Sequence, residues 1–153
     1  MQKKPKVLFL SRGNATRGQM AEGFLRSLAA ERFEATSAGI DPGALNSVAI
    51  EVMNEAGVDI SHQQAKNVKE LLKEHFAYVI TVGDLAREKA PIFPFTPNLV
   101  RWSVYDPESA QHSEEEKKNV FRRVRDEIRA KVESFLSETT KTKPQLAKTA
   151  EAR

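Results

Sequence analysis

The sequence predicts an α/β fold in which a parallel sheet is covered by helices on both faces. Three observations predict it. Short apolar runs of strand length alternate along the chain with segments that carry one apolar face at helical spacing. The first of these runs leads through a glycine-containing loop directly into a helix, as a buried parallel strand does. Strands that alternate with helices in this way form parallel sheets with right-handed crossovers.

Each expected element rests on its own residue pattern. Lys6–Leu10 and Ala77–Val82 are dominated by apolar and β-branched residues, which is typical of strands. Met20, Phe24 and Leu28 recur every four residues and define the buried face of the first helix. In chain order, we expect a strand at 6–10, a helix at 17–32, a strand at 33–38, helices at 47–56 and 68–75, strands at 77–82 and 99–102, and a helix at 113–138.

Polar residues and glycines mark the ends of two of these helices. Asn46 or Ser47 can cap the second helix, and Gly57 is well placed to end it. Ser113 and the acids at 114–116 form a capping box at the start of the last helix. Local hydrogen bonding therefore defines where both helices begin.

We expect one folded domain over residues 1–137. A chain of 153 residues suits a single domain, and 40 % apolar with 29 % charged residues is ordinary for a globular protein. After Leu136 the apolar periodicity disappears, so residues 138–153 are predicted to be a mobile C-terminal tail.

Charge and hydropathy argue against two classes of partner. The net charge is +3, and Lys and Arg are interspersed with acids, so no nucleic-acid partner is expected. The apolar stretch at residues 7–11 is too short for a signal peptide or a membrane span. We therefore expect no membrane partner and a cytoplasmic location.

The chain contains no cysteine, which excludes disulfides, thiolate nucleophiles and cysteine metal sites. Its three histidines, His62, His75 and His112, lie far apart without the spacing of metal ligands. We therefore expect neither a metal nor any other cofactor.

The loop after the first strand, residues 11–17, is the expected functional site. Ligands of parallel sheets bind beyond the carboxyl ends of the strands, where this loop lies. The first N–H groups of a helix have no intrahelical partner, and the helix dipole adds positive potential, so the loop can bind a tetrahedral anion. It is not a nucleotide-binding P-loop, because the Lys-Ser/Thr ending after two spaced glycines is missing.

Individual loop residues have distinct expected roles. Gly13 permits unusual backbone conformations, and Asn14 tolerates a left-handed one and can brace the loop through its side chain. Thr16 can hydrogen-bond the residue at position 11. Arg17 offers a planar fork for two oxygens of the anion, while Arg12 either steers anions from the loop mouth or is simply solvated. The complete expected anion-binding set is Ser11, Arg12, Gly13, Asn14, Ala15, Thr16 and Arg17.

The first strand, loop and helix resemble the signature of the low-molecular-weight protein tyrosine phosphatases, and most of all that of their thioredoxin-coupled arsenate reductase relatives. That signature is a Cys, five residues, an Arg, a Ser or Thr and a helix start like Gln-Met-Ala-Glu; residues 7–24 read VLFLSRGNATRGQMAEGF. The resemblance continues in SAG, EAGVDIS, ITVGD and WSVYDP and covers about residues 6–136. It implies a three-layer α/β sandwich: a four-stranded parallel sheet flanked by helices, with an anion-binding loop after the first strand.

The resemblance assigns roles to residues that this chain retains. It implies that the loop backbone and Arg17 bind the anion. It also implies that Asp106, which precedes a proline as in the family's Asp-Pro loop, is the general acid. The candidate catalytic residues are therefore Ser11, Arg17 and Asp106.

The same resemblance identifies the positions at which sulfur or its partner is missing. The family's nucleophilic Cys maps to Ser11, and the Ser or Thr that tunes it maps to Gly18. The two further cysteines through which the reductases relay a disulfide map to Gly83 and Ala90. Changes spread over four positions favour natural divergence over a single deliberate Cys-to-Ser substitution, which is the other origin open for Ser11.

We therefore expect a family member that binds phosphate-, arsenate- or sulfate-like anions, free or on a phosphorylated protein or small molecule, with weak or absent catalysis. A helix start can bring the pKa of a thiol into the neutral range, but a serine hydroxyl starts too high and needs a base. Arsenate reduction by the family's thiol relay is excluded. Two alternatives remain: an active phosphomonoester (phosphotyrosine) phosphatase whose Cys was substituted by Ser, and a protein-interaction module that retains only the fold.

Overall fold

The computed structural model describes residues 4–91, 93, 96–108 and 113–149 of the chain. Its elements are β1 (Lys6–Ser11), α1 (Arg17–Ala29), β2 (Glu34–Gly39), α2 (Ser47–Glu55), a 3-10 turn (Val68–Leu71), β3 (Tyr78–Val82), α3 (Asp84–Lys89), β4 (Asn98–Trp102) and α4 (Glu114–Thr149). All four predicted strands are present, each within one residue of its expected bounds.

The four strands form one parallel sheet in the order β2-β1-β3-β4. The central strand β1 pairs with β2 along its whole length and with β3 over most of it. Its residues 7–10 have no solvent exposure. The carboxyl end of β1 at Ser11, which pairs with Gly39, is therefore fixed in the middle of the sheet.

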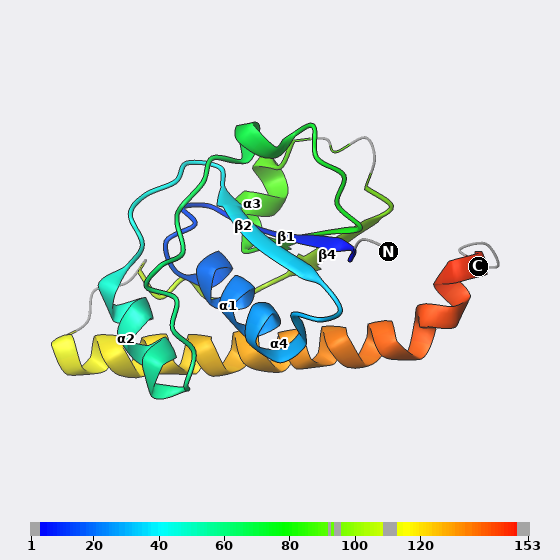
Figure 1. Cartoon of the computed structure of the whole chain (residues 1–153). Helices are drawn as coiled ribbons and strands as arrows, with labels where there is room; N and C mark the ends of the chain where they lie inside the picture. Colours follow the sequence, from blue (N-terminus) through cyan, green and yellow to red (C-terminus); the bar gives the residue numbers. More distant parts are fainter. Residues whose placement is uncertain (1–3, 92, 94–95, 109–112, 150–153) are drawn as a thin grey trace.

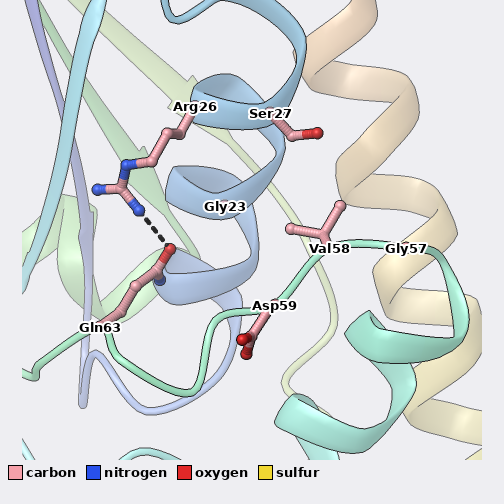
Figure 2. A pocket seen from close by; sticks show the side chains of 7 residues that line it. All are labelled: Gly23, Arg26, Ser27, Gly57, Val58, Asp59 and Gln63. Atoms are coloured by element: carbon pink, nitrogen blue, oxygen red, sulfur yellow. Dashed lines mark hydrogen bonds between the residues drawn. The ribbon is translucent and has the colours of Figure 1, made fainter.

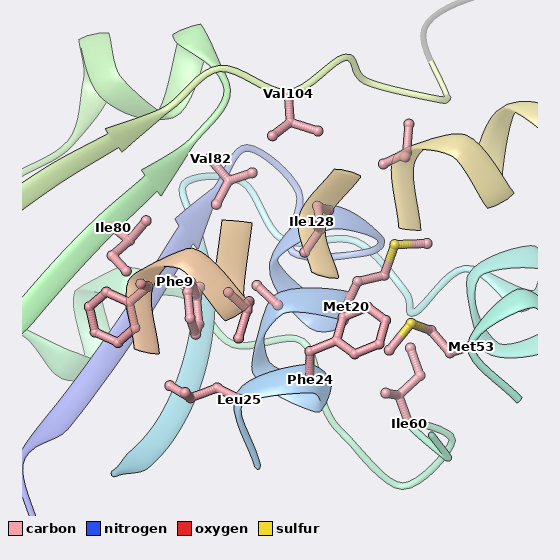
Figure 3. Packing of buried hydrophobic residues seen from close by; sticks show 14 of the residues in the cluster. Phe9, Met20, Phe24, Leu25, Met53, Ile60, Ile80, Val82, Val104 and Ile128 are labelled. Carbon is pink, nitrogen blue, oxygen red and sulfur yellow. The ribbon is translucent and has the colours of Figure 1, made fainter. Parts of the chain in front are cut away.

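Alternate side chains of β1 supply two hydrophobic cores, one on each face of the sheet. Val7 and Phe9 belong to the core that packs against α1, α2 and α4, where Phe24 and Ile128 are fully or almost fully buried (Figure 3). Leu8 and Leu10 belong to the core on the opposite face, with side chains of the 3-10 turn and α3. Figure 1 shows α1, α2 and α4 on one side of the sheet and α3 on the other. The predicted three-layer sandwich is confirmed.

Local caps begin α2 and α4, and a glycine follows the end of α2, as the sequence predicts. Asn46 Oδ1 accepts hydrogen bonds from the N–H groups of residues 48 and 49 at the start of α2. Gly57 follows the end of α2 in a left-handed conformation, with φ 84°. Ser113 and Glu116 exchange hydrogen bonds between each side chain and the other's N–H, which is the expected capping box.

The helices differ from the expectation in four respects. The first is the end of α1, which lies at Ala29 and not near Arg32 as predicted. The segment predicted as a helix at 68–75 is only a 3-10 turn, and α3 was not predicted, because six residues are too few to show a periodicity. α4 continues past the expected end at Glu138 to Thr149. Thr139 is buried there, and its hydroxyl accepts a hydrogen bond from Arg32 in the turn after α1. A contact between segments so far apart in the chain cannot be predicted from the local sequence pattern.

The domain boundary at residue 137 and the mobility of residues 138–153 stay predictions, and residues 150–153 lie outside the described part. Among the helices that the structure describes, none has the length and apolar character needed to cross a membrane.

A carboxylate on α2 ties this helix to α4. Glu55 accepts hydrogen bonds from Arg122 Nε at 2.9 Å and Nη2 at 2.7 Å, and from Arg125 Nη1 at 3.1 Å. The hydrogen bonds from Arg122, with smaller contributions from the charges of both arginines, lower the pKa of Glu55 from 4.5 to about 2.

We predict that Glu55→Gln flattens the acid side of the stability profile. The folded-state pKa of Glu55 lies below its unfolded value, so its ion pairs stabilise the fold above about pH 5 and lose this effect as the pH falls towards 2. The urea midpoint of the wild type should fall more steeply than that of E55Q over this range. Parallel profiles would contradict the assignment.

Candidate anion-binding site

Residues 11–17 connect β1 to α1 and line a cavity of about 340 Å³. The structure brings together every site residue that the sequence predicted, and it adds one. The lining consists of Ser11, Arg12, Gly13, Asn14, Ala15, Thr16, Arg17, Asp106 and Glu108.

The carbonyl oxygens of the loop point out of this cavity. Each carbonyl from residue 11 to residue 16 accepts a hydrogen bond from a group that does not line the cavity. The pairs are Ile40 N to Ser11 O (3.1 Å), Asp41 N to Arg12 O (2.8 Å), Gly43 N to Gly13 O (2.9 Å), Gln19 Nε2 to Asn14 O (2.9 Å), Asn46 N to Ala15 O (3.0 Å) and Met20 N to Thr16 O (2.9 Å). A trans peptide unit is planar with its C=O and N–H on opposite sides. The N–H groups of residues 12–17 therefore lie on the cavity side of the loop.

The start of α1 is not capped by a side chain. Thr16 occupies the N-cap position, but its Oγ1 makes no cap hydrogen bond and is buried without a partner among the described residues. The first N–H groups of α1 are thus left to other acceptors, at the positive end of the helix dipole. The expected hydrogen bond between Thr16 and Ser11 is wrong, because Ser11 Oγ accepts from Asn14 N, at 3.2 Å.

Asn14, and not Gly13, is the left-handed residue of the loop. Asn14 has φ 51°, as predicted, whereas Gly13 has no positive φ and a Cβ there would only meet Asp41 O at 3.8 Å. The Asn14 side chain is fully buried, but its amide atoms have no hydrogen-bond partner in the described part of the chain. The expectation that this side chain braces the loop is therefore wrong, and the backbone carbonyls do so instead.

A series of side-chain hydrogen bonds supports Asn14 from behind. Gln19 Nε2 donates to Asn14 O, and Gln19 Oε1 accepts from Gln63 Nε2 at 2.7 Å. Figure 2 shows the next link, in which Gln63 Oε1 accepts from Arg26 Nη1 at 2.7 Å beside a small pocket of about 160 Å³. Arg26 also pairs with the buried carboxylate of Glu22. The loop is therefore tied both to α1 and to the segment that follows α2.

Arg17 is anchored at one nitrogen and reaches the acids of the cavity with the other. Its Nη1 donates to Val104 O at 2.8 Å, and its Nη2 lies 3.8 Å from Asp106 Oδ2. Burial lowers the pKa of Arg17 below its ordinary value, and the carboxylates of Asp106 and Glu108 offset part of this effect. A guanidinium remains charged at neutral pH, so the cavity contains a buried, fixed positive charge.

Two carboxylates share the wall of the cavity with Arg17. Asp106 Oδ1 accepts a hydrogen bond from Glu108 N at 3.0 Å, and Glu108 Oε2 accepts one from Asn46 Nδ2 at 2.6 Å. The first of these closes a turn in which an Asp side chain caps the backbone two residues on. Sequence reasoning missed Glu108, although its place two residues after Asp106 was a signal for such a turn.

Ser11 is buried at the base of the loop. A Cβ on Gly18 would lie only 2.9 Å from Ser11 Oγ, so the hydroxyl packs against the bare backbone of Gly18. Among the described residues, the lining of the cavity contains no histidine, and its carboxylates are those of Asp106 and Glu108. The described surroundings of Ser11 offer hydrogen bonds and no imidazole that would take its proton.

The described residues do not form a metal centre. No three or more histidine or carboxylate side chains within that part of the chain are grouped to hold a metal ion. His112 lies outside the described residues.

Comparison with known proteins places this fold and loop in one family. A family model described as low molecular weight phosphotyrosine protein phosphatase matches residues 6–146. The chain therefore belongs to the low molecular weight phosphotyrosine protein phosphatase family.

Within this family the chain is similar to arsenate reductases. The arsenate reductase of Shouchella clausii strain KSM-K16 is 38 % identical over 129 residues, which cover 84 % of this chain and 93 % of that protein. The arsenate reductase of Bacillus subtilis strain 168 is 37 % identical over the same length and with the same coverage. These relatives confirm the resemblance noted in the sequence.

Solved structures agree with the fold. An arsenate reductase in the phosphate binding state is 28 % identical, with a TM-score of 0.73, and the match covers 88 % of this chain and 98 % of that one. A low molecular weight protein tyrosine phosphatase from T. tengcongensis has a TM-score of 0.74, and the match covers 88 % of this chain and 99 % of that one. At 23 % identity this likeness concerns the fold alone.

We predict that Gln19→Leu destabilises the protein by about 1–3 kcal/mol. The carbonyls of Asn14 and Gln64 both lose the hydrogen bond from Gln19 Nε2, and the amide of Gln63 loses one of its two acceptors on residue 19. Gln64→Leu is the matched control, since the Gln64 side chain is exposed and only its carbonyl joins the network; it should change stability by less than about 0.5 kcal/mol. Urea denaturation measures both. Equal effects would show that the network does not support the loop.

Proposed function

We propose that the chain binds a phosphate-, arsenate- or sulfate-like oxyanion in the 11–17 loop and turns it over weakly or not at all. The observation that supports this most strongly is the outward direction of the loop carbonyls, which leaves the N–H groups of residues 12–17 on the cavity side. Converging N–H groups at a helix start, with a guanidinium beside them, match the acceptors of a tetrahedral oxyanion. The phosphate-binding state known for a related reductase supports the choice of ligand.

Weak turnover follows from the chemistry of Ser11. A hydroxyl stays protonated in a field that would ionise a thiol, and it becomes a nucleophile only beside a base. In this proposal Ser11 forms a hydrogen bond to the anion. Asp106 occupies the position of the family's general acid, but there is no thiolate nucleophile with which it could act. The chain contains no cysteine, so reduction of arsenate by its own thiols has no source of electrons.

The cavity suits both a free anion and a phosphoryl group attached to a larger molecule. Its volume of about 340 Å³ falls in the range of small-molecule sites, which begins at about 300 Å³. The same donors serve a free ion and the phosphoryl group of a protein or of a small molecule, because both present the same oxygens.

We predict that isothermal calorimetry detects binding of inorganic phosphate and arsenate by the wild type, and that Arg17→Ala weakens it about tenfold or more. The reason is the loss of charge-assisted hydrogen bonds from a buried guanidinium. Arg123→Ala, an exposed residue of α4, is the matched control and should bind like the wild type. Failure of the wild type to bind, or equal binding by R17A, would contradict the proposal and favour a protein-interaction module that keeps only the fold.

The alternative of a phosphomonoester phosphatase is favoured by one observation, the presence of the Asp106 carboxylate in the lining of the cavity. We predict that Ser11→Cys raises aryl phosphate hydrolysis over the wild type on the order of 10³-fold or more, because a thiol at a helix start ionises near neutral pH. The assay should be accompanied by a circular dichroism spectrum of each form. A folded but inert S11C would exclude this reading.

A further inference from the structure

One backbone position outside the cavity lining lies in contact with the guanidinium of the site. Gly83 follows β3 and has φ 99° and ψ 156°, an extended conformation at positive φ that is essentially restricted to glycine. Its N–H donates to Trp102 O at 2.9 Å, which fixes the backbone at this point to the end of β4. Gly83 is therefore joined by its backbone to the end of β4.

A side chain at position 83 would occupy the place of the Arg17 guanidinium. A Cβ built on Gly83 would lie 2.4 Å from Arg17 Nη1, 3.1 Å from Cζ and 3.2 Å from Nη2. The guanidinium thus lies directly against the Cα of Gly83. The atom most affected, Nη1, is also the one that donates to Val104 O.

We infer that Gly83 is a positioning residue for Arg17: its missing side chain opens the space in which the guanidinium is held between the carbonyl of Val104 and the sheet edge. This inference rests on the proposed anion site, since Arg17 is the charged group of that site. In the present conformation, a Cβ at position 83 requires Nη1 to move from its place beside Val104 O, which turns the fork that faces the cavity.

The glycine at position 83 affects the placement of Arg17 as well as removing a sulfur atom. By the resemblance to the reductases this position would carry a cysteine, and a cysteine has the same Cβ as alanine. In the conformation described here, a side chain at position 83 and the present place of Arg17 exclude each other. A Gly83→Cys substitution alone would therefore displace Arg17 from its place at the anion site and would not restore the disulfide relay.

The chain offers a matched control for the backbone strain. Gly57 also has a positive φ, 84°, but a Cβ there would meet no atom within 4 Å. Gly57→Ala therefore imposes left-handed strain without a collision. Gly83→Ala imposes both strain and a collision with Arg17, so comparison with G57A accounts for part of the strain and comparison with an Arg17→Ala background isolates the contact.

The test combines phosphate calorimetry with a thermal double-mutant cycle on the full chain. We expect Gly83→Ala to weaken phosphate binding about tenfold or more, and Gly57→Ala to change it less than about twofold. We expect G83A to lower Tm by about 4 °C or more beyond the effect of G57A. In an Arg17→Ala background, the effect of G83A on Tm should be smaller by about 4 °C or more, because the colliding group is gone while the backbone strain remains.

Equal effects of G83A in the wild-type and R17A backgrounds would overturn the inference, whatever the phosphate result. So would phosphate binding by a folded G83A within about twofold of the wild type. If G83A fails to fold while R17A/G83A folds, the rescue supports the collision; if neither folds, the inference fails. A wild type that does not bind phosphate defeats the proposed function alone, since the thermal cycle still reads the contact.

Discussion

The hydrogen bonds that hold the carbonyls of residues 11–16 outward are the constraint on which the rest of the site depends. They come from three directions: the turn after β2, the start of α2 and the body of α1. Each is ordinary in strength, about 1 kcal/mol net, but together they leave the peptide units little freedom. Because the N–H of each unit lies opposite its carbonyl, the same bonds decide where the donors of the loop point.

In this arrangement, the groups proposed to bind the anion are different from the group that would attack it. The amide donors and Arg17 depend on the backbone, on Val104 O and on the space at Gly83, and none of these involves sulfur. The nucleophile depends on one side chain, Ser11. A member of this family can therefore exchange its thiol for a hydroxyl and keep the parts of the loop on which our proposal of oxyanion binding rests.

Much of this structure could be predicted from the sequence, since local patterns determine it. The run at residues 6–10 predicted the central strand, and the family signature predicted the loop and the place of Asp106. What could not be predicted depends on contacts between distant segments. Glu108 is fixed by Asn46, and the extension of α4 includes a contact of Thr139 with Arg32. The tight approach of Gly83 to Arg17 arises only when β3 and α1 are assembled.

The most direct measurement is a titration of the ¹⁵N-labelled protein with inorganic phosphate, followed by two-dimensional amide NMR spectra. Our account predicts that the amide signals of residues 12–17 and the side-chain Nε signal of Arg17 move together and saturate at one common affinity. Signals on the exposed face of α4 should stay in place. If the loop amides do not move, or move only as much as amides across the whole surface, the loop does not hold the anion and the account is contradicted.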